Sequence, residues 1–155
     1  MLADTAQKSP RLNTLAFASV LVAIVIALSS HALAGDPTGV WLVQDRSAKV
    51  RVGTCSDALC GKVIWIREPI DPTNGKPWLD KNNSDPHQRN RHLLGIPIAI
   101  DMKASQVPNK WTGRVYSIDH GKHFDGSLTL LTPTKLKIEG CLLLICQSEI
   151  WTRAD

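Results

Sequence analysis

The sequence predicts an all-β domain, an eight-stranded antiparallel up-and-down barrel, that follows an N-terminal export signal. Three observations predict this. Residues 1–34 have the charge and hydropathy pattern of a signal peptide, residues 35–155 show repeated period-two alternation of apolar and polar side chains, and turn-forming residues separate the alternating segments. No 11-residue window of residues 35–155 has a convincing helical stripe.

The export signal occupies residues 1–34. Lys8 and Arg11 make its start basic, and an apolar run spans residues 15–28. Ala32-Leu33-Ala34 then forms a small-x-small cleavage site. The alternative is an uncleaved anchor, but about fourteen helical residues span roughly 21 Å, less than the roughly 30 Å core of a bilayer. We therefore expect a signal-peptide helix, cleavage after Ala34, export to the periplasm or beyond, and no stable membrane insertion afterwards.

The composition excludes some functions. The chain has 18 basic and 14 acidic residues, a formal net charge of +4 at pH 7, and the charges are scattered singly. One Tyr and two Phe offer few rings for stacking on bases, so we expect no nucleic-acid partner. Residues 35–155 are a suitable length for a single domain with one core.

Strand character recurs along residues 35–155. Val50 and Val52 share one face of an alternating segment, and Leu136 and Ile138 share one face of another. The eight predicted strands are residues 39–45, 48–54, 61–67, 96–101, 110–117, 123–131, 135–139 and 147–153. Eight antiparallel strands suit an up-and-down barrel or a sandwich. Side chains fill the interior of such a barrel, or it holds one small ligand.

The four cysteines predict disulfides, because their number is even and the domain is exported. Three pairings are possible. We favour the local pairs Cys55–Cys60 and Cys141–Cys146, since each Cys-x4-Cys segment lies where a hairpin turn is expected. The alternative is a zinc site of four thiolates, but such sites usually contain Cys-x2-Cys. We expect no metal and no other cofactor.

Two short motifs resemble the pattern of lipocalin-like (calycin) barrels. Gly39-Val40-Trp41 stands near the start of the mature chain, and Trp151-Thr152-Arg153 stands near its end. In those barrels an Arg or Lys of the last strand lies across the Trp of the first, which is a cation–π contact. The resemblance implies that Gly39, Trp41 and Arg153 close the barrel.

The mature chain also resembles the DUF2147 family, exported bacterial proteins of unknown function. The matching segments are residues 39–41, 55–65, 80–86, 89–95, 111–116, 136–141 and 151–153. The resemblance implies a single exported domain with a lipocalin-like barrel, and it implies no activity. Family members often carry a Cys or Pro near Leu93-Leu94-Gly95, and this chain has neither there.

The polar segment from Glu68 to His92 is the main candidate site, because connections of this length tend to be functional or to cover something. The candidate ligand-binding residues are Trp78, Asp80, Asp85, Arg89 and Arg91. The tryptophan is expected to cover the barrel mouth, and the two arginines to act as paired donors to a carboxylate or phosphate. In the alternative interpretation, the aspartates accept backbone N–H bonds and pair with the arginines inside the loop.

Two functions remain open from sequence. The favoured one is a binding barrel that holds a small, partly apolar ligand behind the loop, and the other is a cell-envelope interaction module with a packed interior. His120-Gly-Lys-His123 suggests a metal site, but its spacing suits a helix better than a hairpin turn and no acidic partner is placed by sequence, so we expect a solvated turn. We expect no enzyme, because no catalytic motif is present. The interior volume discriminates between the two functions, since ligand sites occupy about 300–1,000 Å³. The sequence does not indicate an oligomeric state.

Overall fold

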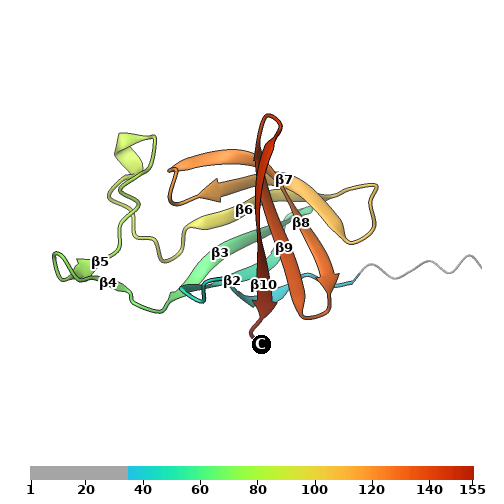
Figure 1. Ribbon diagram of the computed structural model, residues 1–155, viewed down its shortest axis with the longest axis horizontal. Helices are drawn as coiled ribbons and strands as arrows, with labels where there is room; N and C mark the ends of the chain where they lie inside the picture. Colours follow the sequence, from blue (N-terminus) through green and yellow to red (C-terminus); the bar gives the residue numbers. More distant parts are fainter. Residues whose placement is uncertain (1–34) are drawn as a thin grey trace, which may run out of the picture. The chain divides into compact units, whose positions relative to one another are not determined.

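The computed structural model describes residues 35–155, and the predicted signal peptide lies outside the described residues. The barrel strands are β1 (Gly39–Leu42), β2 (Ala48–Cys55), β3 (Ala58–Ile66), β6 (Pro97–Ala104), β7 (Lys110–Ser117), β8 (Lys122–Thr132), β9 (Lys135–Leu142) and β10 (Ile145–Arg153). They close into one barrel in the order β1-β10-β9-β8-β7-β6-β3-β2 (Figure 1). All neighbouring strands are antiparallel, so the predicted eight-stranded up-and-down barrel is confirmed.

The up-and-down order gives the barrel two different ends. The β1–β2, β7–β8 and β9–β10 turns lie at one end, together with the long β3–β6 connection. The start of β1, the end of β10 and the remaining turns lie at the other end. Within residues 35–155, no helix is long and apolar enough to cross a membrane.

The alternation predicted from sequence places apolar side chains in the core. Val50 and Val52 are buried on β2, and Leu136 and Ile138 are buried on β9. Burial of this kind contributes about 25 cal/mol per Å² of apolar surface. The inward side chains therefore fix the register of each strand, because a one-residue slip would turn them all outward.

The first and last strands of the barrel meet near the start of β1 and the end of β10. Trp41 on β1 pairs with Arg153 on β10, and the Arg153 guanidinium carbon lies 4.3 Å from the centroid of the Trp41 ring. The same guanidinium donates to the carbonyl oxygens of Thr38 at 2.7 Å and Asp36 at 2.9 Å. Gly39 has φ +129°, and a Cβ there would meet the guanidinium. These contacts close this end of the barrel.

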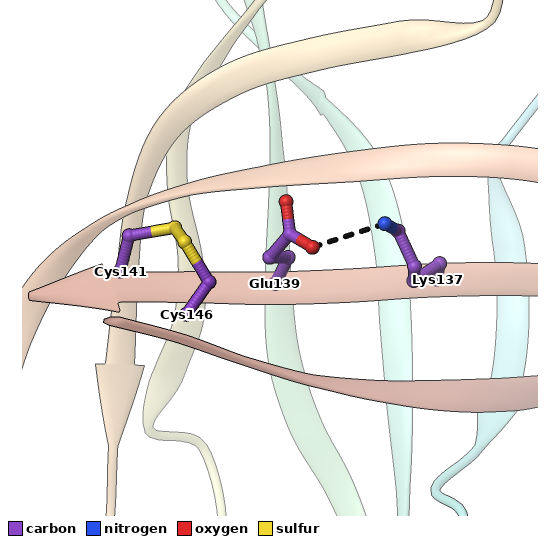
Figure 2. The surroundings of a disulfide bond; sticks show 4 residues. All are labelled: Lys137, Glu139, Cys141 and Cys146. Carbon is purple, nitrogen blue, oxygen red and sulfur yellow. Dashed lines mark hydrogen bonds and ion pairs between the residues drawn. A yellow bond between two sulfur atoms is a disulfide. The ribbon is translucent and has the colours of Figure 1, made fainter. Parts of the chain in front are cut away.

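Two disulfides join Cys55 to Cys60 and Cys141 to Cys146, with Cα–Cα distances of 5.8 and 4.0 Å, so the predicted local pairing is confirmed. The predicted bends around them are too long. The strands run up to and past the cysteines, and only Ser56-Asp57 and residues 143–144 turn. Figure 2 shows the second disulfide, and its cysteines face each other across β9 and β10, one register pair from the end of the hairpin.

The long connection between β3 and β6 has structure of its own. It contains the small hairpin β4 (Ile70–Asp71) and β5 (Lys76–Pro77) and the 3₁₀ turn η1 (Pro86–Gln88). Its backbone packs on the β7–β8 turn, where Ser84 N–H donates to the Gly121 carbonyl at 2.9 Å. Gly121 has φ +62°, and a Cβ there would collide with the backbone of Asn82. Glycine therefore permits the close approach that docks the loop.

Candidate functional site

A cavity of about 1340 Å³ occupies the end of the barrel opposite the Trp41–Arg153 closure. Its walls come from the β1–β2 turn, the end of β3, the β7–β8 turn and the distal part of β9 and β10. This volume is sufficient for a ligand, since binding sites occupy about 300–1,000 Å³. The open end of the barrel therefore has room for a ligand, whereas the rest of the interior is packed around residues such as Leu128, Leu136 and Met102.

The floor of the cavity is apolar. Its inward side chains are Val50, Val63, Ile98, Val115, Ile138 and Trp151, all of which are buried. Alternation along the strands places them there, and they separate the cavity from the fully buried core around Leu128 and Met102. The floor can therefore accept an apolar group but offers few hydrogen bonds to a polar one.

The rim of the cavity is polar and carries both signs of charge. Its charged residues are Asp45, Arg67, Glu68, Asp119, Lys122 and Glu149. Carboxylates outnumber the cationic side chains, so the rim does not favour an anionic ligand group. The combination of an apolar floor and a polar rim suits a molecule with one apolar and one polar part.

Trp78, on the β3–β6 connection, is among the residues that line the cavity. Its indole N–H donates to the Glu68 carbonyl at 2.9 Å, and the Lys81 ammonium lies 5.9 Å from its ring centroid. These contacts tie the ring to the loop, so its position depends on how the loop is fastened to the barrel.

The loop is fastened by a buried network around Asp80, whose side chain is fully buried. The Tyr116 hydroxyl donates to the Asp80 carboxylate at 2.7 Å and accepts from the Asn83 amide at 2.9 Å. Arg91 Nε donates to the same carboxylate at 2.9 Å, and the guanidinium carbon lies 5.1 Å from the Tyr116 ring centroid. Because Val115 points inward, Tyr116 lies on the opposite face of β7, under the loop.

The network determines two protonation states. Burial raises the pKa of Asp80, but hydrogen bonds from Asn83, Tyr116 and Arg91 outweigh burial and leave this pKa below its ordinary value. Burial, and then the hydrogen bond to Asp80, raise the pKa of Tyr116 to about 12. At neutral pH the tyrosine therefore keeps its proton and donates a hydrogen bond to an ionised aspartate.

The other predicted ligand residues form hydrogen bonds within the loop. The Asp85 carboxylate accepts from His87 N–H at 3.0 Å and caps η1, and Arg89 Nε donates to the Asn83 carbonyl at 2.7 Å. Arg89 has helical backbone angles, φ −65° and ψ −18°, and not the extended ones that would align it with Arg91. Asp80, Asp85, Arg89 and Arg91 are absent from the cavity walls. The Asp85 cap and the Arg91–Asp80 pair agree with the internal-contact interpretation, but Arg89 donates to a carbonyl and not to an aspartate.

The histidines of the β7–β8 turn also make local contacts. His120 Nδ1 lies 2.9 Å from Ser117 Oγ, and the His123 ring centroid lies 4.9 Å from that of Tyr116. Burial, followed by the charges of Arg114 and Arg91, lowers the pKa of His123. Within residues 35–155, no group of three or more His, Cys, Asp or Glu side chains is placed to hold a metal ion.

Sequence reasoning missed the cavity floor and the role of Tyr116. The floor residues Val63, Val115 and Ile138 could have been found by continuing the inward alternation away from the closed end. The partnership of Tyr116 with Asp80 spans 36 residues, and no local pattern indicates it.

Three comparisons bear on this barrel. Residues 39–153 match the family described as uncharacterised proteins conserved in bacteria, DUF2147. A solved structure, protein HP1028 of Helicobacter pylori, described as belonging to the lipocalin family, superposes with a TM-score of 0.63 and 17% identity. That match covers 78% of this chain and 84% of the other, and at this identity it shows the fold alone. Among curated protein sequences, none matches. The chain belongs to the DUF2147 family, and its fold is a lipocalin-like barrel.

Proposed function

We propose that the mature chain is a periplasmic binding protein for a small amphipathic molecule and not an enzyme. The single observation that carries the proposal is the cavity of about 1340 Å³ with an apolar floor and a polar rim. The two disulfides support an oxidising compartment outside the cytoplasm. The lipocalin-like fold is compatible with this role.

The floor supplies the affinity in this proposal. Each buried CH₂ group contributes about 0.8 kcal/mol, so an alkyl chain of about eight carbons would contribute roughly 6 kcal/mol before the cost of association. The rim selects the polar group. Asp45, Glu68, Asp119 and Glu149 outnumber Arg67 and Lys122, so a zwitterionic or uncharged head should bind better than an anionic head.

Native mass spectrometry tests the proposal. The mature chain is purified from the periplasm, measured as isolated, extracted with organic solvent and measured again. It is then titrated with a lysophosphatidylcholine and a fatty acid of the same chain length, both below their critical micelle concentrations. We expect a saturable one-to-one complex, with the zwitterionic ligand bound more tightly. No mass increment and no saturable complex with either ligand would refute the proposal.

A further inference from the structure

The β9–β10 hairpin ends in four consecutive large apolar residues. Leu142, Leu143, Leu144 and Ile145, here called the apolar tip, are 63, 93, 98 and 75% exposed. In Figure 1 this hairpin projects beyond the neighbouring turns. Single exposed apolar residues are common on proteins, but a contiguous exposed cluster marks a contact surface.

The chemistry of the turn shows that folding does not require these leucines. Leu143 is the first residue of a two-residue turn and has φ +55°, a conformation that glycine or asparagine adopts at lower cost. The other disulfide-linked turn in the barrel, Ser56-Asp57, places a polar residue, Ser56, at the equivalent position with φ +58°. The tip therefore carries both backbone strain and apolar exposure, and a contact made by the leucines accounts for both.

A disulfide stabilises the hairpin next to the tip. Cys146 and Cys141 face each other in the register and are disulfide-bonded immediately below the tip. Figure 2 shows this bond on the same hairpin as the Lys137–Glu139 ion pair of 3.0 Å. Among the described residues, β1 pairs with β10 at only two positions, Arg153 and Thr152, so the distal half of β10 has no partner strand on that side.

The apolar tip is continuous with the cavity. Leu142 and Ile145, the two strand residues of the tip, also line the cavity wall. Leu143 and Leu144 extend the same apolar surface outward. On β9 the inward positions run from Leu142 through Gly140 to Ile138, so an alkyl chain could follow this strand from the tip to the floor.

We propose that the apolar tip inserts into the surface of a phospholipid membrane and that the cavity takes up an alkyl-chain amphiphile from that membrane. This inference rests on the proposed function, since it names the ligand class and its source. A lipid surface fits the tip better than a protein does. A stable protein interface uses roughly 20–30 residues on each side, whereas the tip is a convex point of four residues that needs no complementary pocket in a lipid layer.

Vesicle flotation of the mature chain tests the inference. With phosphatidylcholine vesicles we expect the wild type to float and the double variant Leu143→Ser/Leu144→Ser to lose at least about tenfold in vesicle binding. Both side chains are more than nine-tenths exposed, so the variant should keep its fold and its circular dichroism spectrum. The matched control is Val107→Ser/Leu131→Ser, which removes exposed apolar side chains from the opposite end and should float like the wild type.

Depth measurement and a vesicle-free assay separate this inference from the proposed function. In the Leu144→Trp variant, the fluorescence added by the new indole ring should be quenched by phosphatidylcholine brominated on its acyl chains. Without vesicles, the double tip variant should bind lysophosphatidylcholine as the wild type does, because Leu143 and Leu144 do not line the cavity. Equal flotation of the tip variant and the wild type would overturn the inference. So would a wild-type dimer in sedimentation that the tip variant loses while neither protein floats.

Discussion

Replacing Tyr116 with phenylalanine removes one hydroxyl group from the joint between the long loop and β7. The ring and its contact with Arg91 remain, but Asp80 loses a donor at 2.7 Å and the Asn83 amide loses an acceptor at 2.9 Å. A hydrogen bond to a charged group contributes about 1.5–3 kcal/mol to stability. Asp80 keeps its bonds from Arg91 and Asn83, so we expect a loss of about 2 kcal/mol.

Urea unfolding at neutral pH measures this loss as a lower midpoint at unchanged slope. In a domain of this size a loss of about 2 kcal/mol also lowers the thermal midpoint by about 6–10 °C. Asp80→Asn removes the charge of the acceptor in the same hydrogen bond. The loss of stability in the double variant should differ from the sum of the two single losses by at least about 1 kcal/mol. Asp85→Asn is the matched control, because asparagine also caps a helical turn and the change should stay within about 0.5 kcal/mol.

The reasoning is refuted if Tyr116→Phe unfolds within about 0.5 kcal/mol of the wild type. Strict additivity of Tyr116→Phe and Asp80→Asn would also refute it, because residues that share a buried hydrogen bond cannot act independently. Either result would mean that the loop is held by contacts other than the buried network.

Three other predictions concern the closure, the loop and acid. Arg153→Lys keeps the charge but loses the planar array of N–H donors, so the free energy of unfolding in urea should fall by about 1–2 kcal/mol. Arg51→Lys, on the exposed face of β2, is the control and should leave the free energy of unfolding unchanged. Gly121→Ala should speed amide hydrogen exchange across the docked loop, and Gly75→Ala, with similar φ but open space around it, should leave that exchange nearly unchanged. The pKa of Asp80 is lower in the folded protein than the value of about 3.9 in the unfolded chain, so its contribution to stability is present above that value and is lost as the pH falls through the folded-state pKa. Thermal midpoints between pH 6 and pH 2 should therefore fall less steeply for Asp80→Asn than for the wild type.

Local sequence patterns were sufficient to predict the barrel. Period-two alternation at Val50 and Val52 marks a strand with one buried face, and both side chains are buried in the structure. The pairing of Trp41 with Arg153 follows from the resemblance to closed barrels and is present at 4.3 Å. The sequence predicts strand boundaries outside each cysteine pair, whereas strand pairing continues inside it, because a disulfide across a two-residue turn leaves no local sign of where pairing stops.

Long-range contacts limited the prediction of the site. The role of Asp80 depends on Tyr116, which is 36 residues away in the chain, so a ligand contact and an internal contact could not be told apart from sequence. Trp65 shows the same limit on a strand. A large aromatic residue on a strand is usually buried, but Trp65 is 40% exposed on the outer face, with the Lys49 ammonium 5.5 Å from its ring centroid. The register of a strand is a property of the closed sheet and not of one segment.

The central claim is that the barrel interior takes up an apolar molecule, and filling the interior tests it most directly. A Cβ on Gly140, which lines the cavity, would lie 3.6 Å from Phe124 Cβ and 3.9 Å from Val115 Cβ, so Gly140→Phe places a ring in the cavity without a backbone clash. Gly53→Phe is the matched control, since a Cβ there meets nothing within 4 Å. In a fluorescence titration with the uncharged dye N-phenyl-1-naphthylamine, the wild type and Gly53→Phe should bind equally, and Gly140→Phe should bind at least about tenfold more weakly. Equal binding by all three proteins, or no binding by the wild type, would contradict the account.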